Sequence, residues 1–199
     1  MITYPILIGG APCSGKSTIA KQLSKKFEIP WIPTDWLRYL MAGLVHKEEY
    51  PSLFNMDNID PVEYLSSNTP TQIIRDENER SKEVYKIIKL VLERKYDWNS
   101  YIIEGVSITP ELIVQVLPDF PTLKYIFLIE NNVDRIKEVI YTRGLWDDAD
   151  QYPDSVKGHE VEWVIEYNKW LKEECIEKRL NYLEIINRED TLERVLEKL

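Results

Sequence analysis

The sequence has few of the features that would point to a secreted, membrane or metal-binding protein. It contains two cysteines, Cys13 and Cys175, in 199 residues, which is too few for a disulfide framework. Its apolar runs are too short to cross a bilayer, and the apolar stretch at the N-terminus lacks the basic start and the cleavage region of a signal peptide. The two histidines, His46 and His159, are isolated in the sequence and predict no metal site. We therefore expect a soluble protein of a reducing compartment, with the cytoplasm as the default.

The chain also has an excess of acidic residues. Lys and Arg together number 25 against 34 Asp and Glu, and the net charge is −9. Long-range attraction to nucleic acid or to an anionic membrane is therefore unfavourable, and we expect neither as a partner. An anionic ligand must be held by a local site. The length predicts one domain over residues 1–199, as a monomer or a homodimer.

Apolar residues alternate between strand-like runs and helical spacing along the chain. The patterns predict strands at 3–8, 30–35, 100–105, 123–130 and 181–186, and helices at 17–27, 37–44, 84–92, 133–143, 172–179 and 190–199. Asn131 or Asn132 is a suitable cap for the helix before Arg143, and Asp190 for the last helix. This alternation, in which most strands are followed by helices, favours a doubly wound α/β fold.

The strongest motif is GAPCSGKS, Gly10 to Ser17, which we call the phosphate loop. It matches the pattern G-x-x-x-x-G-K-[ST] directly after a predicted strand and at the start of a predicted helix. In this setting, successive backbone N–H groups and the first turn of the helix surround a phosphate. The predicted nucleotide-binding residues are Gly10, Ala11, Cys13, Ser14, Gly15, Lys16, Ser17 and Thr18.

Each residue type in the phosphate loop has a physical reason to be there. Gly10 and Gly15 permit backbone conformations and close approaches that a side chain would block. Lys16 reaches the β- and γ-phosphates of ATP, and the Ser17 hydroxyl is placed to bind Mg²⁺. Cys13 occupies a free position of the motif with no histidine nearby in the sequence, so packing explains it better than nucleophilic catalysis.

The rest of the sequence favours a small phosphotransferase over other nucleotide enzymes. The N-K-x-D element of GTPases is missing, and the apolar strands end in glutamate instead of the aspartate typical of motor ATPases. TDWLR, residues 34–38, follows the second strand, so Asp35 is expected near the γ-phosphate, where it can orient or deprotonate an attacking hydroxyl. Arg38 can bind an anionic group of the acceptor. The structural alternatives are a helix N-cap for Asp35 and an exposed ion pair with Asp35 for Arg38.

Two further positions belong to the predicted site. Glu104 ends the strand SYIIEG and can bind Mg²⁺ through water, fix Lys16 or Asp35, or be an ordinary strand-end acid. Gly105 lets the chain turn away beside the ligand. Arg143 ends a predicted helix, where it serves either as a helix cap or as the cation that meets the transferring phosphoryl group.

The stretches without clear periodicity are interpreted as inserts. Residues 45–70 are expected to face the substrate, and residues 144–158 have the length and turn content of a lid that follows Arg143. This lid is acidic, so Arg143 would supply most of its positive charge.

GGAPCSGKST, TDWLR and YIIEGVSITPEL together resemble the kinase domain of 2-phosphoglycerate kinases, within the nucleoside- and gluconate-kinase-like branch of P-loop proteins. The resemblance extends over about the first 140 residues and is specific at these three motifs. It implies a three-layer α/β fold for nucleoside triphosphates, with a five-stranded parallel sheet and a helical lid, and transfer from ATP with Mg²⁺. Ser107 stands where the family tends to have histidine.

These observations predict an ATP-dependent kinase that transfers the γ-phosphoryl group to a hydroxyl of a small metabolite, with Lys16, Asp35 and Arg143 as catalytic residues. Two alternatives stay open. One is a nucleotide-binding regulatory switch that transfers nothing, and the other is a toxin-like kinase that acts on a nucleotide sugar.

Overall fold

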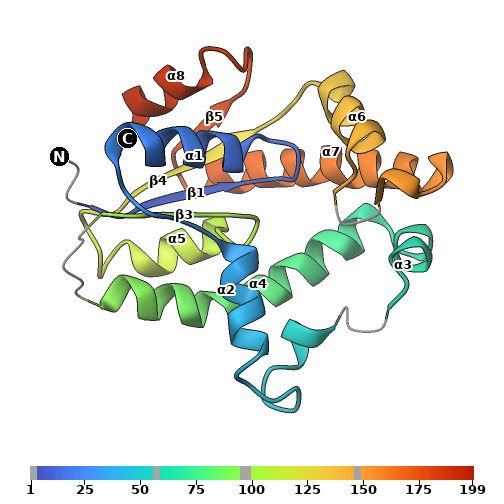
Figure 1. Ribbon diagram of the computed structural model, residues 1–199, viewed down its shortest axis with the longest axis horizontal. Helices are drawn as coiled ribbons and strands as arrows, with labels where there is room; N and C mark the ends of the chain where they lie inside the picture. The colour runs from blue at the N-terminus through green and yellow to red at the C-terminus, as the bar shows by residue number, and fades with distance from the viewer. Residues whose placement is uncertain (1–3, 56–58, 95–99, 146–148) are drawn as a thin grey trace.

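Five parallel strands form a single sheet in the computed structural model, which describes residues 4–55, 59–94, 100–145 and 149–199 (Figure 1). The strands lie in the order β2-β3-β1-β4-β5. Their bounds are β1 (Ile6–Gly10), β2 (Trp31–Pro33), β3 (Ile102–Glu104), β4 (Lys124–Ile129) and β5 (Tyr182–Glu184). The predicted α/β class and the five-stranded parallel sheet are confirmed.

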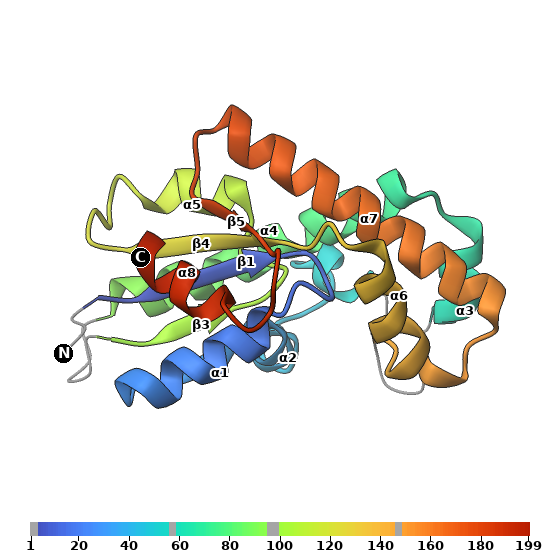
Figure 2. The same ribbon diagram turned by 90° about the horizontal axis from the view of Figure 1, so that it is seen from above.

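The central strands are apolar on both faces, as the sequence predicts, because helices cover both. Ile6 and Ile8 of β1 pack in one apolar cluster with Leu23 of α1 (Lys16–Phe27) and with α8 (Thr191–Lys198). Leu7 points to the other face, toward the cluster built by α4 (Pro70–Glu93), α5 (Pro110–Val116) and α7 (Asp154–Glu177). Figure 2 shows α1 and α7 on opposite sides of the sheet. The result is a three-layer sandwich.

The connections between strands differ from the predicted ones at two places. Between β2 and β3 the chain forms α2 (Thr34–Ala42), the 3-10 helix η1 (Pro51–Phe54), α3 (Pro61–Ser67) and α4, where we expected two helices, at 37–44 and 84–92. Between β3 and β4 it forms α5, where we expected none. Helices α3 and α5 are seven residues long, too short to show a clear helical period, and each begins with proline after a capping side chain.

Two predicted helix caps have opposite outcomes. The Asn132 side chain accepts a hydrogen bond from the backbone N–H of Arg135 at 3.0 Å and caps α6 (Val133–Thr142), as predicted. Asp190 precedes α8, but its side chain makes no capping hydrogen bond. Its backbone is already helical, at φ −93° and ψ −3°, whereas a capping side chain usually extends from the β region. The predicted role of the Asp190 side chain is therefore wrong.

The two predicted inserts lie past the carboxyl ends of the strands and contain regular structure. The described part of 45–70 holds η1 and α3, whose Asp60 cap accepts from the backbone N–H of Val62 at 2.8 Å. The described part of 144–158 holds the 3-10 helix η2 (Ala149–Gln151) and the start of α7, while 146–148 lie outside the described residues. Both views show α3 and α6 beyond the strand ends (Figures 1 and 2). Throughout the described ranges, no helix has the length and apolarity needed to cross a membrane.

Candidate active site

A cleft of about 1050 Å³ opens at the carboxyl ends of the strands. All predicted site residues line it except Gly10 and Ala11, which lie at the base of the phosphate loop. The predicted residues brought together there are Cys13, Ser14, Gly15, Lys16, Ser17, Thr18, Asp35, Arg38, Glu104, Gly105 and Arg143. The structure thus gathers into one cavity residues that are separated by up to 130 positions in the sequence.

The phosphate loop has a backbone geometry that favours glycine at two of its positions. Gly15, at φ +78°, is followed directly by the first residue of α1. A Cβ atom on Gly10 would lie 2.6 Å from Ser14 Oγ, so the loop closes tightly around its own base. The Ser14 side chain is 1% exposed, and its hydroxyl has no hydrogen-bond partner in the described part of the chain. A buried free hydroxyl beside the unpaired amides of a helix N-terminus fits an oxyanion such as phosphate.

Lys16 is held inside the loop. Its side chain is 8% exposed, and Nζ donates a hydrogen bond to the Ala11 carbonyl oxygen at 2.7 Å. Burial lowers the pKa of the amine, and the nearby carboxylates of Glu104 and Asp35 oppose that shift. The ammonium group is therefore preorganised at the loop, between carboxylates that favour its charge.

Glu104 connects the loop to the second strand. Its carboxylate is nearly buried, and Oε1 accepts a hydrogen bond from Trp31 Nε1 at 3.3 Å. Burial raises the pKa of Glu104, whereas the Lys16 charge and hydrogen bonds from Ser17 and Trp31 act to lower it. Glu104 therefore bonds to Trp31 and Ser17 and influences Lys16 through its charge, and the predicted roles of Glu104 stay predictions.

The position of Asp35 follows from a close contact between the ends of β2 and β3. Glu104 pairs with Pro33 across the sheet, and a Cβ atom on Gly105 would lie 1.8 Å from Thr34 Oγ1. Glycine at 105 therefore lets the start of α2 lie against the end of β3. Asp35, in the first turn of α2, is exposed to the cleft next to Glu104.

The structural alternatives for Asp35 and Arg38 are wrong. The N-cap residue of α2 is Pro33, and no side chain makes a capping hydrogen bond to this helix. Within the ranges that the structure describes, no ion pair joins Arg38 to Asp35; the Arg38 guanidinium lies 4.6 Å from the centre of the Tyr39 ring. Both charged groups face the cleft without neutralising each other.

Arg143 lies on the opposite wall, at the C-terminus of α6. Its backbone N–H bonds to the last turn of the helix, while its exposed side chain is close enough to influence the phosphate loop: its charge acts to lower the pKa of Lys16 and of Cys13. Burial nevertheless raises the pKa of Cys13 to about 11. Cys13 is therefore a poor nucleophile at neutral pH and packs against the core, as predicted.

The cleft also contains residues that the sequence did not single out. Arg188 follows β5, so the rule that ligands bind beyond the carboxyl ends of strands could have found it. Arg80 and Glu77 of α4 form an ion pair at 2.7 Å, and Trp163 lies on α7. These three come from the middle of long helices, where no local pattern distinguishes a site residue from an ordinary one.

The residues present fit Mg²⁺ bound together with a nucleotide. The Ser17 hydroxyl and the carboxylates of Asp35 and Glu104 share one rim of the cleft, and Mg²⁺ prefers such oxygen ligands. Among the described residues there is no group of three or more His, Cys, Asp and Glu that could hold a metal by itself. A metal here would therefore depend on phosphate oxygens as additional ligands, as is usual for Mg²⁺ in kinases.

Comparison with known proteins gives structural neighbours only. No model of a protein family matches the chain, and no curated protein matches it in sequence. A gluconokinase from Sinorhizobium meliloti 1021 superposes with a TM-score of 0.57 at 13% identity, over 98% of this chain and 91% of the other. A shikimate kinase from Bacteroides thetaiotaomicron gives 0.51 at 16% identity, over 98% and 96% of the two chains. A deoxyadenosine kinase from M. mycoides, with bound dATP, gives 0.51 at 12% identity, over 98% of each.

The chain has the three-layer α/β fold of P-loop proteins that bind nucleoside triphosphates. The neighbours share its architecture over nearly the whole length, and the phosphate loop stands at the strand end where this fold requires it. At these identities the likeness shows the fold alone. The resemblance to 2-phosphoglycerate kinases stays a prediction.

Proposed function

We propose that this protein is a kinase that transfers the γ-phosphoryl group of ATP to a hydroxyl of a small, anionic metabolite. One observation carries the proposal: the phosphate loop opens into the same cleft as an exposed carboxylate, Asp35, and the guanidinium of Arg38, which pairs with no carboxylate of the described residues. Phosphoryl transfer needs little more than alignment and charge stabilisation, and this arrangement offers both.

The phosphate loop holds the triphosphate. Amides of the loop and of the first turn of α1 bind the phosphate oxygens, and Lys16 neutralises charge on the β- and γ-phosphates. Arg143, on the facing wall, stabilises charge on the transferring group. Mg²⁺, when bound by Ser17 and Glu104, would neutralise negative charge that develops on the phosphates.

The acceptor lies between α2 and the phosphate loop. Its hydroxyl oxygen forms a bond to the γ-phosphorus while the bond from that phosphorus to the oxygen of the leaving ADP breaks, and Asp35 takes the hydroxyl proton. Arg38 binds a carboxylate or phosphate of the acceptor in a bidentate manner. A phosphorylated hydroxy acid of the 2-phosphoglycerate type has both a hydroxyl to accept the phosphoryl group and anionic groups for Arg38 to bind. This agrees with the resemblance of the three sequence motifs.

The test is a screen of acceptors by ADP release, with the product identified by mass spectrometry. The screen includes hydroxy acids, sugar acids, nucleosides and nucleotide sugars. With the acceptor found, Asp35→Asn is expected to lower kcat about 100- to 10,000-fold with unchanged nucleotide affinity, since a general base contributes about that much. Asp134→Asn is the matched control, because Asp134 also lies in the first turn of a helix but outside the cleft.

The possible results separate the hypotheses. Near-full kcat in Asp35→Asn would refute the role of Asp35. Tight nucleotide binding without ADP release for any acceptor would favour the regulatory switch, and a phosphorylated nucleotide sugar would favour the toxin-like kinase.

A further inference from the structure

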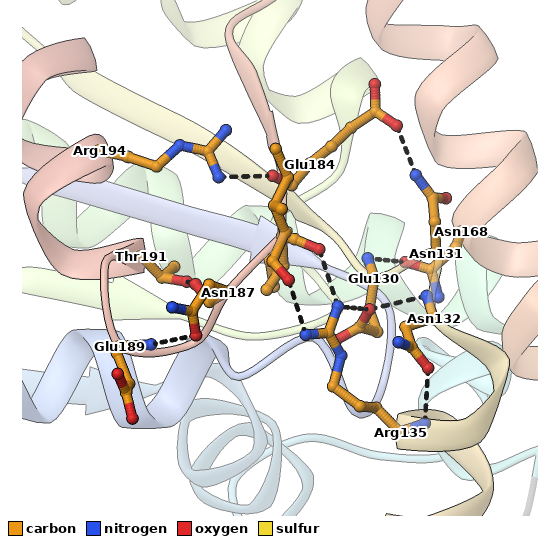
Figure 3. A network of polar contacts seen from close by, with 12 residues as sticks. Glu130, Asn131, Asn132, Arg135, Asn168, Glu184, Asn187, Glu189, Thr191 and Arg194 are labelled. Atoms are coloured by element: carbon orange, nitrogen blue, oxygen red, sulfur yellow. Dashed lines mark hydrogen bonds and ion pairs between the residues drawn. The ribbon is translucent and has the colours of Figure 1, made fainter.

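Arg135 on α6 connects three separate segments of the chain through one guanidinium group (Figure 3). Its Nη1 donates to the carbonyl oxygen of Ile186 at 2.9 Å, and its Nη2 donates to that of Ile185 at 2.9 Å. Nη2 also pairs with Glu130 Oε1 at 3.0 Å. The planar fork of arginine permits this arrangement, in which a cation bridges the end of β4 and the segment after β5.

Glu130 is a rigid anchor for this contact. Its side chain is fully buried, and Oε1 also accepts from the backbone N–H of Asn132 at 2.8 Å. The backbone N–H of Glu130 donates to Asn168 Oδ1 at 2.8 Å, and Asn168 in turn donates to the carbonyl oxygen of Val164 at 2.8 Å. The Asn132 N–H at the start of α6 thus fixes the carboxylate, and α7 fixes the backbone of Glu130, so that Arg135 pairs with a well-placed anion.

The segments that Arg135 joins form two walls of the cleft. After β5, Ile185, Arg188 and Thr191 line the cavity. Ile185 belongs to the same apolar cluster as Ile19 of α1, and the Arg188 charge acts on the pKa of Cys13 in the phosphate loop. The segment 185–191 therefore lies against the phosphate loop.

The second wall is α6 itself, whose residues Val139, Thr142 and Arg143 line the cavity. Arg143 follows Arg135 by eight residues, which is about 12 Å along a helix. Arg135 is not among the residues that line the cleft, so it connects both walls from behind.

We propose that Arg135 is a positioning residue for the nucleotide. By holding the carbonyl groups of Ile185 and Ile186, it keeps the segment 185–191 against the phosphate loop and aligns it with the helix that carries Arg143. The inference rests on the proposed function in one respect, namely that the cleft binds a nucleotide. Loss of this contact is expected to weaken nucleotide binding about tenfold and to change the KM of the acceptor less than twofold.

The experiment must separate positioning from stability, because Arg135→Gln leaves a buried carboxylate without its cation. The double variant Glu130→Gln, Arg135→Gln removes both charges and keeps an oxygen that can accept from the Asn132 N–H. The matched control is Arg194→Gln. Arg194 also donates to a backbone carbonyl of this region, that of Glu184 at 3.1 Å, but from α8 instead of α6.

Three quantities are measured for each protein: the Tm, the Kd of a nonhydrolysable ATP analogue with Mg²⁺, and amide hydrogen exchange of 185–191 without nucleotide. We expect Arg135→Gln to lose both stability and affinity. The double variant should recover the Tm, bind the analogue about tenfold more weakly than the wild type and exchange faster at 185–191. The control should bind as the wild type does.

A purely structural role predicts a different result, in which affinity and exchange of the double variant return to wild-type values together with the Tm. That outcome would overturn the inference and leave the kinase proposal intact. Failure of the wild type itself to bind the analogue would refute the proposed function, and the inference with it.

Discussion

The two halves of the cleft are built in different ways. The phosphate half consists of one continuous segment, 10–18, at a strand end. The other half, which we propose binds the acceptor and call the acceptor half, is assembled from α2, α3, α4 and α7, with Arg38, Tyr64, Arg80 and Trp163 among its lining residues. The triphosphate of a nucleotide needs the same backbone N–H groups whatever the acceptor is, so a local motif is sufficient to bind it. An acceptor pocket needs a particular shape, which only the packing of several helices supplies.

Buried charged groups in the phosphate half have hydrogen-bond partners, whereas one buried carboxylate of α7 has none among the described residues. On the phosphate side, Lys16 bonds to a carbonyl oxygen and Glu104 accepts from Trp31. On α7, Glu160 is 0% exposed, and neither of its carboxylate oxygens has a hydrogen-bond partner among the described residues. Burial raises the pKa of Glu160 to about 7, against an opposing effect of Lys157. The comparison can be tested in both halves.

The largest expected effect is that of Lys16→Ala in the phosphate half. We expect kcat to fall about 1000-fold with every acceptor, because the lost cation stabilises phosphate charge common to all of them. Steady-state kinetics with two chemically different acceptors measures this. Lys25→Ala, an exposed position on the same helix, should keep full activity. If Lys16→Ala kept more than a tenth of the wild-type kcat, catalysis by the phosphate loop would not depend on its lysine.

The next effect concerns stability and pH. Because the pKa of Glu160 in the folded protein is about 7 instead of 4.5, the folded state holds a proton that the unfolded chain releases between these values. The free energy of unfolding therefore falls as the pH rises from about 4.5 to about 7, by up to about 3 kcal/mol from this group.

Glu160→Gln removes this dependence. The variant should match the wild type near pH 5 and exceed its Tm by roughly 5 °C at pH 8. Thermal unfolding at the two pH values measures this, with the exposed neighbour Glu162→Gln as the control. Equal Tm values of variant and wild type at pH 8 would mean that Glu160 acquires a partner in solution.

The smallest effect separates the two halves. Arg38→Ala should raise the KM of the acceptor about tenfold and leave the KM of ATP nearly unchanged, because Arg38 belongs to the acceptor half alone. Arg38→Lys, which keeps the charge but loses the bidentate fork, should give an intermediate KM. A parallel rise in the KM of ATP would show that the halves are not independent.

Prediction from the sequence succeeded where a feature is local. The motif and its flanking apolar runs located the phosphate loop, and short apolar runs located all five strands. The runs of the central strands β1, β3 and β4 are the clearest, because a strand covered on both faces is apolar throughout. Helices α3 and α5 were missed because seven residues are too few to establish a period. The Asp190 cap failed because backbone geometry, which the residue type does not determine, decides whether a side chain can cap.

The strand-end rule also worked for parts of the site that are distant in the sequence. Asp35 and Glu104 were expected at one rim because parallel strands end together, and Gly105 allows the close contact with Thr34 that joins them. Arg188 follows the same rule.

The sequence by itself determined the phosphate loop and the three-layer class of fold, since both depend on residues that are close together in the sequence. Only the tertiary structure decided which helical residues face the acceptor, that Arg135 bridges α6 to the segment after β5, and that Glu160 is buried without a hydrogen-bond partner in the described part of the chain. The physical reason is that burial and charge pairing depend on what packs against a side chain, and those neighbours come from distant parts of the chain.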